Sequence, residues 1–408
     1  MASTNLAPYF RLLINGSTEL TAGHYGLIQS VSVEASADGA DELVIRALAK
    51  DPAGKAGSAW KFLGENVLAP GNLVTVEAGY LDGDPGVVLQ RFRLHAEAAQ
   101  YPSSGPPEVE IRGYSPEAAL GAYTRPRTWK GPIADSVIVK EIAEFHGLTV
   151  TADSLADTAE RTTGRVKAQG TSDLVFLAQL AVANGYGSPI VRYDPDADAD
   201  VLYFRPQVVD TAESLALIYD PAEDGGTMGA GNLLSFSPEL DLHGVPTRVE
   251  ITGWDPAAQV PIVVVMELGA DGQDPTVLSG EATAAAGYKI TSGSQMQAKA
   301  LTDAQDPTGE RVESVPVPSV TTTDDAIAWA TRWIKLRNTA FLTARGTTVG
   351  IPSLWVGQVH RVGGVAPTHA GLWEIKRVAH RFGSSGYTCD VDFDRVLDES
   401  AEPAEGAP

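Results

Sequence analysis

The sequence predicts an α+β protein that is mainly β, in which one strand-built unit occurs twice and two insertions carry the helices. Three observations support this. Short segments of alternating apolar and polar residues, separated by glycine-containing turns, dominate the chain. Residues 68–111 and 354–393 match each other in the spacing of several residues. Helical periodicity is confined to residues 114–205 and 269–346.

Residues 1–113 predict the first β unit. The segments 9–14, 27–33 and 43–48 have strand character, and turns are expected at Asn15-Gly16 and at residues 38–41. The first copy of the repeat follows. Because the stretch after residue 205 returns to β character, we expect residues 206–245 to complete this first unit.

The two copies of the repeat share one internal order. Each opens with Leu-x-x-Gly-x-Leu/Val and continues with a valine, an aromatic-x-aliphatic pair, Ser-Ser-Gly and a closing alternating strand. Chance similarity is the alternative in any β-rich chain, but the distance from the aromatic residue to Ser-Ser-Gly is the same in both copies. The matching segments are Leu68–Leu73, Val76, Phe92–Leu94, Ser103–Gly105 and Val109–Ile111 in the first copy, and Leu354–Val359, Val362, Trp373–Ile375, Ser384–Gly386 and Val391–Phe393 in the second.

Residues 114–205 predict an inserted α+β domain. Asp135 and Ser136 are candidate N-caps for a helix that His146-Gly147 ends. A second helix is expected from Thr171-Ser172-Asp173 to Asn184-Gly185. Two strands complete the domain, at residues 190–193 and 201–204.

Residues 246–397 predict the second β unit, with an insertion at 269–346. The segments 247–254 and 261–268 alternate or are rich in β-branched residues, so we expect them to open this unit. From Gly269 to Pro318 the composition is polar and typical of a long loop-like excursion. Residues 398–408 are expected to form a disordered tail.

The second insertion also carries a helix. Thr322–Asp325 resembles a capping box, and we expect the helix to run to about Ala344 and end at Gly346. Its aromatic residues favour a buried face over a cofactor site. This face contains Ile327, Ala330, Ile334 and Phe341, with Trp329, Trp333 and Leu336 beside it.

Composition excludes several classes of protein. A net charge of −22 opposes tight nucleic-acid binding, and the small basic cluster of Arg125, Arg127 and Lys130 favours a solvated loop or a rim contact. The single cysteine, Cys389, rules out an internal disulfide and is expected to be buried in a strand. No apolar run approaches a membrane span, and the N-terminus lacks a signal pattern, so we expect folding in the cytoplasm.

Two groups of residues could bind a metal ion. Asp194, Asp196, Asp198 and Asp200 alternate like a calcium loop, but Ala199 and Arg205 stand where an EF-hand needs glycine and glutamate, so a solvated hairpin tip is favoured.

His360 and His369 flank a glycine-containing turn, where surface loop residues are the simpler interpretation, and His380 favours a buried or edge hydrogen bond. No nucleophile elbow, P-loop or dinucleotide motif occurs, and we assign no catalytic, cofactor-binding or metal residues.

Several motifs give the chain a resemblance to a known family. The signature Gln-x-x-Ser-Asp-x-x-Phe-Leu-x-x-Leu-Ala spans residues 169–181 and follows an apolar helix ending in Gly-Leu at residue 148. Over residues 5–397 the chain resembles the baseplate hub proteins of contractile phage tails and related injection systems, also called late control protein D. Further matching positions are Asn184–Tyr186, Leu202–Pro206, Val249–Asp255, Leu354, Gly357, Gly371, Val378, His380 and Tyr387.

The resemblance implies a structural role without catalysis or cofactors. Two tube-type β-barrels per chain and three chains per ring would give six barrels, matching a hexameric tail tube on one side and a trimeric spike on the other. Implied partners are the tube protein, the spike protein and possible wedge or LysM-type hub-associated proteins, with nucleic acid only as passing cargo. The particle would assemble in the bacterial cytoplasm and contact no membrane in its resting state.

The chain departs from some relatives, because it stops shortly after its last predicted strand. The spike is therefore expected to be a separate polypeptide, and cell-wall hydrolysis is not expected. A negative bore would let DNA or acidic cargo pass without sticking. Two alternatives stay open: a cell-wall-degrading tail enzyme and a secreted carbohydrate-binding β protein. The sequence does not decide between a phage tail and a phage-derived injection system.

Overall fold

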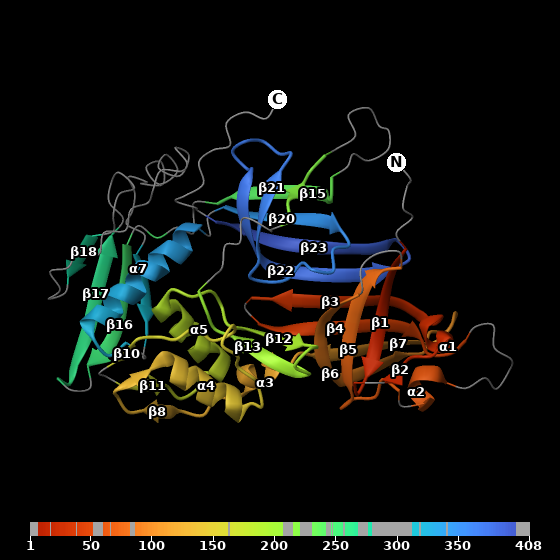
Figure 1. The fold of residues 1–408 in the computed structure, drawn as a ribbon, viewed down its shortest axis with the longest axis horizontal. Coiled ribbons are helices and arrows are strands. Elements are labelled where there is room, and N and C mark those ends of the chain that lie inside the picture. Colours follow the sequence, from red (N-terminus) through yellow and green to blue (C-terminus); the bar gives the residue numbers. More distant parts are fainter. Residues whose placement is uncertain are drawn as a thin grey trace.

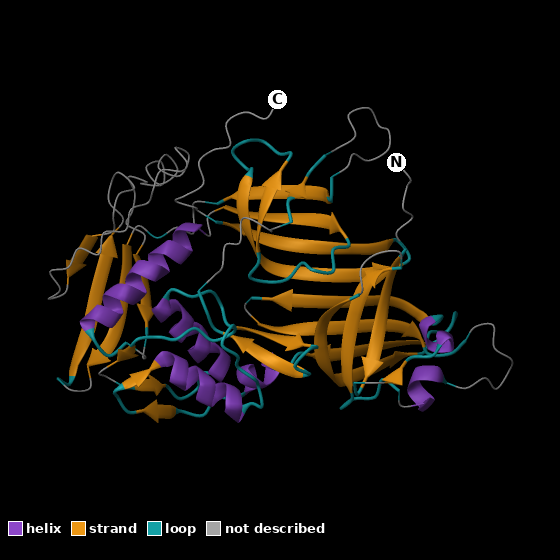
Figure 2. Cartoon of the chain, in the orientation of Figure 1, coloured by secondary structure: helices purple, strands orange, loops and turns teal. Residues whose placement is uncertain are grey.

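The computed structural model confirms a mainly β protein with α+β character (Figure 2). Most strands belong to one antiparallel sheet, and the longer helices lie beside it with smaller sheets. None of the described helices is both long and apolar enough to cross a membrane. The structure describes residues 7–16, 18–37, 39–51, 60–65, 67–81, 86–161, 164–206, 215–220, 231–241, 246, 248–255, 258–267, 276–279, 312–317, 320–339 and 342–396.

Thirteen strands form the large sheet, and they fall into two groups along its length (Figure 1). The first group contains β1 (Pro8–Ile14), β2 (Thr18–Glu19), β3 (Ile28–Ser36), β4 (Gly39–Leu48), β5 (Leu73–Tyr80), β6 (Val87–Gln100) and β7 (Glu108–Tyr114), with the short helices α1 (Ala22–Tyr25) and α2 (Lys61–Glu65). The second group contains β14 (Leu217–Ile218), β15 (Leu233–Leu240), β20 (Leu342–Val349), β21 (Val359–Gly363), β22 (Gly371–Gly383) and β23 (Gly386–Arg395).

The sheet runs in the order β15-β20-β23-β22-β3-β4-β7-β6-β5-β1-β2, with β21 on β22 and β14 on β21. Side chains alternate across it, so that one face of each strand enters a core. In β23, for example, Tyr387, Cys389, Val391 and Phe393 are buried. One continuous apolar cluster contains residues of both groups, so the two units share a core.

The duplication is confirmed in backbone detail. Gly71 and Gly357 both have positive φ, +99° and +80°, and their N–H groups donate to Leu94 O at 2.7 Å and Ile375 O at 2.9 Å. A β-bulge follows at the same place in both copies, directly after Leu94 and after Ile375.

The turns after these strands match as well. Gly105 and Gly386 adopt φ values of +98° and +100°. One detail of the sequence alignment is wrong by two residues: counted from the bulges, Ile111 corresponds to Val391 and not to Phe393. A shift of two keeps the side chains on the same face, which is why alternation alone did not reveal it.

The expectation that residues 206–245 complete the first unit is wrong in its strand pairing. β14 pairs with β21, and β15 pairs with β20, so both strands belong to the second group. Strand character alone cannot name the partner of a strand. Among the described strands no ladder closes either group on itself, so closure into a barrel stays a prediction.

The α+β insertion has its own core, formed mainly between two helices. The N-cap of α5 is Ser172, whose Oγ accepts from Val175 N–H at 3.2 Å, and Gly185 ends this helix with φ +73°, as expected. Gly147 follows the end of α4, as expected. The elements are α3 (Glu117–Ala122), β8 (Arg127–Trp129), β9 (Ile133–Ala134), α4 (Asp135–Phe145), β10 (Glu160–Arg161), β11 (Arg165–Lys167), α5 (Asp173–Asn184), β12 (Ile190–Asp194) and β13 (Ala199–Tyr203).

The second insertion begins earlier than expected. The strands at 248–255 and 260–267 do not open the second unit; they form a separate four-stranded sheet, in the order β18-β17-β16-β19, against which α7 packs (Figure 1). Parts of the expected loop-like excursion are strands of this sheet, and its remaining residues, 269–275, 280–311 and 318, lie outside the described residues. The elements are β16 (Arg248–Asp255), β17 (Val260–Glu267), β18 (Thr276–Ser279), β19 (Val312–Pro316) and α7 (Thr323–Thr339).

The start of α7 is as expected and its end is not. Thr322 Oγ1 accepts from Asp325 N–H at 3.1 Å, and Trp329 is buried while Trp333 packs against the same core. The helix ends at Thr339, because the segment from Leu342, with its alternating buried side chains, forms β20 between β15 and β23. The expected helical residue Phe341 and the tail 398–408 lie outside the described residues.

Candidate functional site

The two sheet groups are joined by one ladder, here called the seam. In the seam, residues Arg377–Phe382 of β22 run antiparallel to Val31–Ser36 of β3 (Figure 1). Strands far apart in the chain thereby become neighbours in one sheet. The seam joins the two groups into a single sheet, because its backbone hydrogen bonds are continuous with those of both groups.

A forked ion pair fastens the outer side of the seam. Arg377 Nε donates to Glu34 Oε1 and Nη2 donates to Glu34 Oε2, both at 2.6 Å. The hydrogen bonds from Arg377 hold the pKa of Glu34 below its usual range. Sequence analysis missed this pair, because 343 residues separate its members and no local pattern marks it.

A neutral polar cluster lies under the seam. Within hydrogen-bonding distance, His380 Nε2 lies 3.1 Å from Leu354 O, and His380 Nδ1 lies 2.8 Å from Tyr387 Oη. The carbonyl can only accept, so Nε2 carries the proton and the tyrosine donates to Nδ1. Cys389 Sγ lies 3.3 Å from the same Nδ1.

Burial keeps this cluster uncharged near neutral pH. It lowers the pKa of His380 to about 4 and raises the pKa of Cys389 to about 11. A thiolate, which is the nucleophilic form of cysteine, is therefore disfavoured. The expected buried roles of Cys389 and His380 are confirmed.

His360, another buried histidine singled out in the sequence, contacts protein oxygens through both ring nitrogens. His360 Nδ1 lies 3.0 Å from Leu215 O and its Nε2 lies 3.2 Å from Gln358 Oε1, so both ring nitrogens have protein partners. Burial lowers the pKa of His360. Within the described ranges, no three His, Cys, Asp or Glu side chains are grouped to hold a metal ion.

The acidic run forms the hairpin between β12 and β13, as expected. Asp194 Oδ1 accepts from the backbone N–H groups of Asp196 and Ala197, which closes the turn. Arg91 Nη2 forms an ion pair with Asp200 Oδ2 at 2.7 Å. The carboxylates thus order a turn and attach it to β6.

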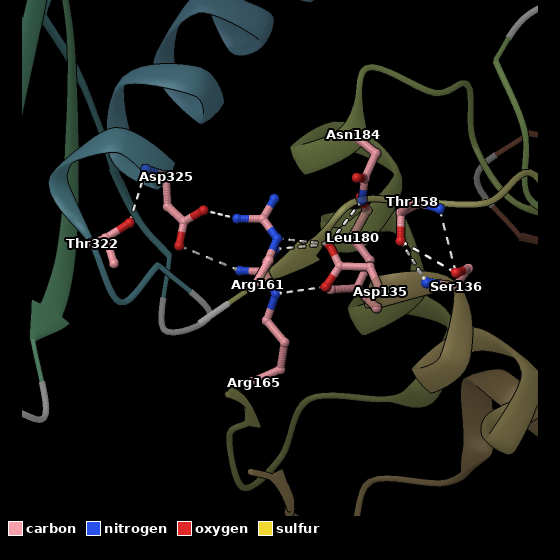
Figure 3. Close-up of polar contacts among 9 residues, drawn as sticks. All are labelled: Asp135, Ser136, Thr158, Arg161, Arg165, Leu180, Asn184, Thr322 and Asp325. Atoms are coloured by element: carbon pink, nitrogen blue, oxygen red, sulfur yellow. Dashed lines mark hydrogen bonds and ion pairs between the residues drawn. The ribbon is translucent and has the colours of Figure 1, made fainter. Parts of the chain in front are cut away.

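A buried ionic network joins the two insertions (Figure 3). Asp135, the first residue of α4, accepts from Arg165 Nε at 2.8 Å and from Asn184 Nδ2 at 2.9 Å. Arg161 contacts both Asp135 and Asp325 of α7, and so bridges the insertions. The expected N-cap role of Asp135 and Ser136 is wrong, because Ala134 is the N-cap and the Asp135 carboxylate faces the arginines.

Burial by itself would raise the pKa of Asp135. The hydrogen bonds and positive charge of Arg165, together with Asn184 and Arg161, outweigh it and hold this pKa below its usual range. A charged Asp135 is therefore part of the folded structure, and it joins α4 to β10, β11 and α5.

A second polar centre attaches the α+β insertion to the first sheet group. Gln90 of β6 donates to Asp41 Oδ2 and to Val191 O, each at 2.8 Å, and its Oε1 accepts from Tyr193 N–H at 2.9 Å. Desolvation raises the pKa of Asp41 to about 7 and the pKa of nearby Glu117 to about 9. These carboxyl groups lie at the buried junction between the α+β insertion and the first sheet group.

No family model and no curated protein matches this sequence. Solved structures nevertheless resemble the chain over nearly its whole length. The tail protein of prophage MuSo2 from Shewanella oneidensis superimposes with a TM-score of 0.60 at 14% identity, covering 95% of this chain and 98% of that one. A tail protein from Neisseria meningitidis gives 0.58 at 12% identity, with 95% and 96% covered.

A third similar structure comes from Escherichia coli. It is a component of the type VI secretion system that itself resembles tail proteins of bacteriophage T4, and it gives a TM-score of 0.50 at 10% identity, with 97% and 79% covered. The chain therefore has the fold of phage tail proteins and of a type VI secretion component. The resemblance inferred from the sequence is confirmed at the level of the fold.

Proposed function

We propose that this protein is a structural baseplate hub of a contractile phage tail or a phage-like injection system. The observation that carries the proposal is the seam, which presents two equivalent sheet units side by side in one chain. Three such chains can form a ring of six units. A ring of this kind joins a sixfold tail tube to a threefold spike.

In this role the protein is a homotrimeric adaptor with the tube protein and the spike protein as its neighbours. Wedge or LysM-type hub-associated proteins are further partners, and nucleic acid passes only as cargo. The strand pairing supports a first unit at residues 7–114 with the α+β insertion after it. It supports a second unit at 215–241 and 342–396, interrupted by the second insertion.

The protein has no catalytic task in this proposal. Cys389 and His380 are buried, and burial disfavours the charged form of each. The rival function is a cell-wall-degrading tail enzyme. A turbidity assay on cell-wall suspensions separates the two: we expect no clearing beyond buffer, and clearing by purified protein would favour the enzyme.

The oligomeric mass tests the structural role directly. Three chains of 42.9 kDa give an expected mass of about 129 kDa, which sedimentation or light scattering measures. Addition of the cognate tube protein or spike protein should yield a larger complex with three copies of this chain. A chain that stays monomeric alone and with both partners, or that acts as a monomer on a small molecule, would contradict the proposal.

A further inference from the structure

β22 and β6 are equivalent strands of the two copies, but in the part of the chain that the structure describes, part of one edge of β6 has no paired strand where β22 has one. One side of β22 pairs with β21 near its start and with β3 in the seam further along. In the other copy, β6 pairs with β5 near its start, but among the described strands nothing pairs with that side beyond the bulge. The free segment is Ala96–Tyr101, which corresponds to Arg377–Phe382 of the seam.

A second free edge is the counterpart of β3. In the seam β3 lies between β4 and β22. Its counterpart β15 pairs with β20, and on its other side, among the described residues, only Leu233 at its start makes a bridge, to Tyr219. β4 and β20 are counterparts, because each pairs with the closing strand of its copy, β7 or β23, in the same register. β3 pairs with β4 as β15 pairs with β20, which makes Phe236 the counterpart of Val31 and Glu239 the counterpart of Glu34. The free segment of β15 is therefore Phe236–Leu240.

We propose that the free edge of β6 in one chain pairs antiparallel with the free edge of β15 in a second copy, in the register of the seam. This inference rests on the proposed trimeric hub and specifies how its chains join. Transferring the seam register places Gln100 opposite Ser237, Ala99 opposite Pro238 and Tyr101 opposite Phe236 of the next chain. The contact is head-to-tail, and three repeats close a ring of six units.

Exposure of apolar side chains on both edges supports a covering partner. Tyr101 is 68% exposed, whereas its seam counterpart Phe382 is 5% exposed. Leu240 is 46% exposed, whereas its counterpart Ala35 is fully buried. Pairing in the seam register would cover both residues, as it covers their counterparts.

The two free edges differ in their protection against pairing: the edge of β6 has neither proline nor lysine, whereas the edge of β15 contains one proline. Residues 96–100 of β6 read Ala-Glu-Ala-Ala-Gln, without the proline or lysine that commonly blunts an edge strand. On β15, Pro238 provides a carbonyl acceptor but no N–H donor, so the ladder between chains has one donor fewer than the seam. Ala96 stands where the seam has Arg377, so the forked ion pair is missing too, and we expect the contact between chains to be weaker than the seam.

The seam also defines which pair can be cross-linked. Ala37 N–H donates to Lys376 O at 2.9 Å, which makes Ser36 and Arg377 a non-hydrogen-bonded pair. Hydrogen-bonded and non-hydrogen-bonded pairs alternate along the ladder, so Ser32 and Arg381, four residues along, also form a non-hydrogen-bonded pair. Ser237 and Gln100 are the counterparts of these two residues. Such pairs have Cα atoms about 4.5 Å apart, within the range of a disulfide.

The test is oxidative cross-linking of the full-length chain carrying both Gln100→Cys and Ser237→Cys. We expect covalent dimers and trimers that reductant returns to single chains. The matched control carries Gln100→Cys and Glu239→Cys, on the same strands and the same face but two residues out of register, where the Cα separation of about 7 Å or more disfavours a disulfide. Native Cys389 is buried and stays in place in both.

The outcomes separate this inference from the proposed function. A trimer by mass without the in-register cross-link, or with the control cross-linked equally well, would overturn the strand pairing and leave the trimeric hub standing. A chain that is monomeric with its tube and spike partners and forms no cross-link would overturn both. A mixture of the two single variants should give dimers only, because each contact needs one edge from each chain.

Discussion

At the scale of single residues, buried polar groups connect segments that are distant in the sequence. Gln90 attaches the α+β insertion to β6, and Asp135 with Arg161 attaches that insertion to α7. Each group is largely satisfied by hydrogen bonds, so its value lies in fixing the arrangement of parts. Removing one partner leaves the other buried without its hydrogen bond, and this costs more free energy than replacing both partners by apolar groups.

The first residue-scale prediction concerns the ionic network. Asp135→Asn removes the carboxylate that lies 2.8 Å from the guanidinium of Arg165, whose side chain is 1% exposed. We expect a loss of about 3–5 kcal/mol in the free energy of unfolding, the usual cost of breaking a buried ion pair. Urea unfolding followed by tryptophan fluorescence measures it.

The matched control is Glu19→Gln, which breaks the exposed pair with Arg11 and should lower the free energy of unfolding far less than Asp135→Asn does. Equal losses in the free energy of unfolding from the two variants would mean that the buried network stabilises the fold no more than an exposed ion pair does. A loss confined to the Asp135 variant supports its role in joining the insertions.

The second residue-scale prediction is a pH dependence. Because desolvation raises the pKa of Glu117 to about 9, the folded protein binds a proton that the unfolded chain has lost above its ordinary pKa. Stability therefore falls as pH rises toward 9, by at most about 1.4 kcal/mol per pH unit for one group.

Asp41, with a pKa of about 7, contributes in the same direction at lower pH, and His380 contributes in the opposite direction below the ordinary histidine pKa. Urea unfolding between about pH 7.5 and 8.5 isolates Glu117 from both. Glu117→Gln should flatten the slope in this window. An unchanged slope would show that Glu117 is not the titrating group.

At the scale of elements, the repeat unit depends on a glycine in a left-handed conformation before the bulged strand. Gly71 and Gly357 both have open space around the position of a Cβ, so an added methyl group meets no atom within 4 Å. The cost of a substitution there comes from the backbone conformation alone.

We therefore expect Gly71→Ala and Gly357→Ala to lower the free energy of unfolding by similar amounts, about 1–2 kcal/mol each. The control is Gly121→Ala in α3, which also has open space and no positive φ, and should be neutral or slightly stabilising. Thermal or urea unfolding of the three variants checks this. Unequal losses at the two repeat glycines would argue against an equivalent role.

Sequence patterns located these elements better than they located their partners. Local signals such as Ser172, Gly185 and the Ser-Ser-Gly turns marked helix ends and hairpins, because their causes lie within a few residues. The placement of β15 and of the Glu34–Arg377 pair depends on contacts between segments more than one hundred residues apart, which periodicity does not encode. The end of α7 was missed because residues 342–349 suit a strand only once β23 lies beside them.

At the scale of the whole molecule, the chain is acidic and contains the sheet unit twice. Its net charge is −22, and the free edges carry Glu97 and Glu239 with no basic side chain in residues 96–101 or 236–240. Association of such chains brings like charges together, while backbone hydrogen bonds and apolar contacts with Tyr101 and Leu240 favour it. Electrostatics therefore opposes the ring and strand pairing stabilises it.

This balance predicts the effect of salt on the trimer. Raising the ionic strength from about 0.05 M to about 0.5 M shortens the Debye length to a few ångströms and screens the repulsion, so the association should strengthen. An assembly held by ion pairs between chains would instead weaken. Sedimentation velocity at a series of protein concentrations gives the dissociation constant at each salt level. The variant Gln100→Lys places a cation beside Glu239 of the next chain. It should therefore reduce the salt dependence of the dissociation constant. A dissociation constant that rises with salt would contradict a contact built on backbone pairing between acidic chains.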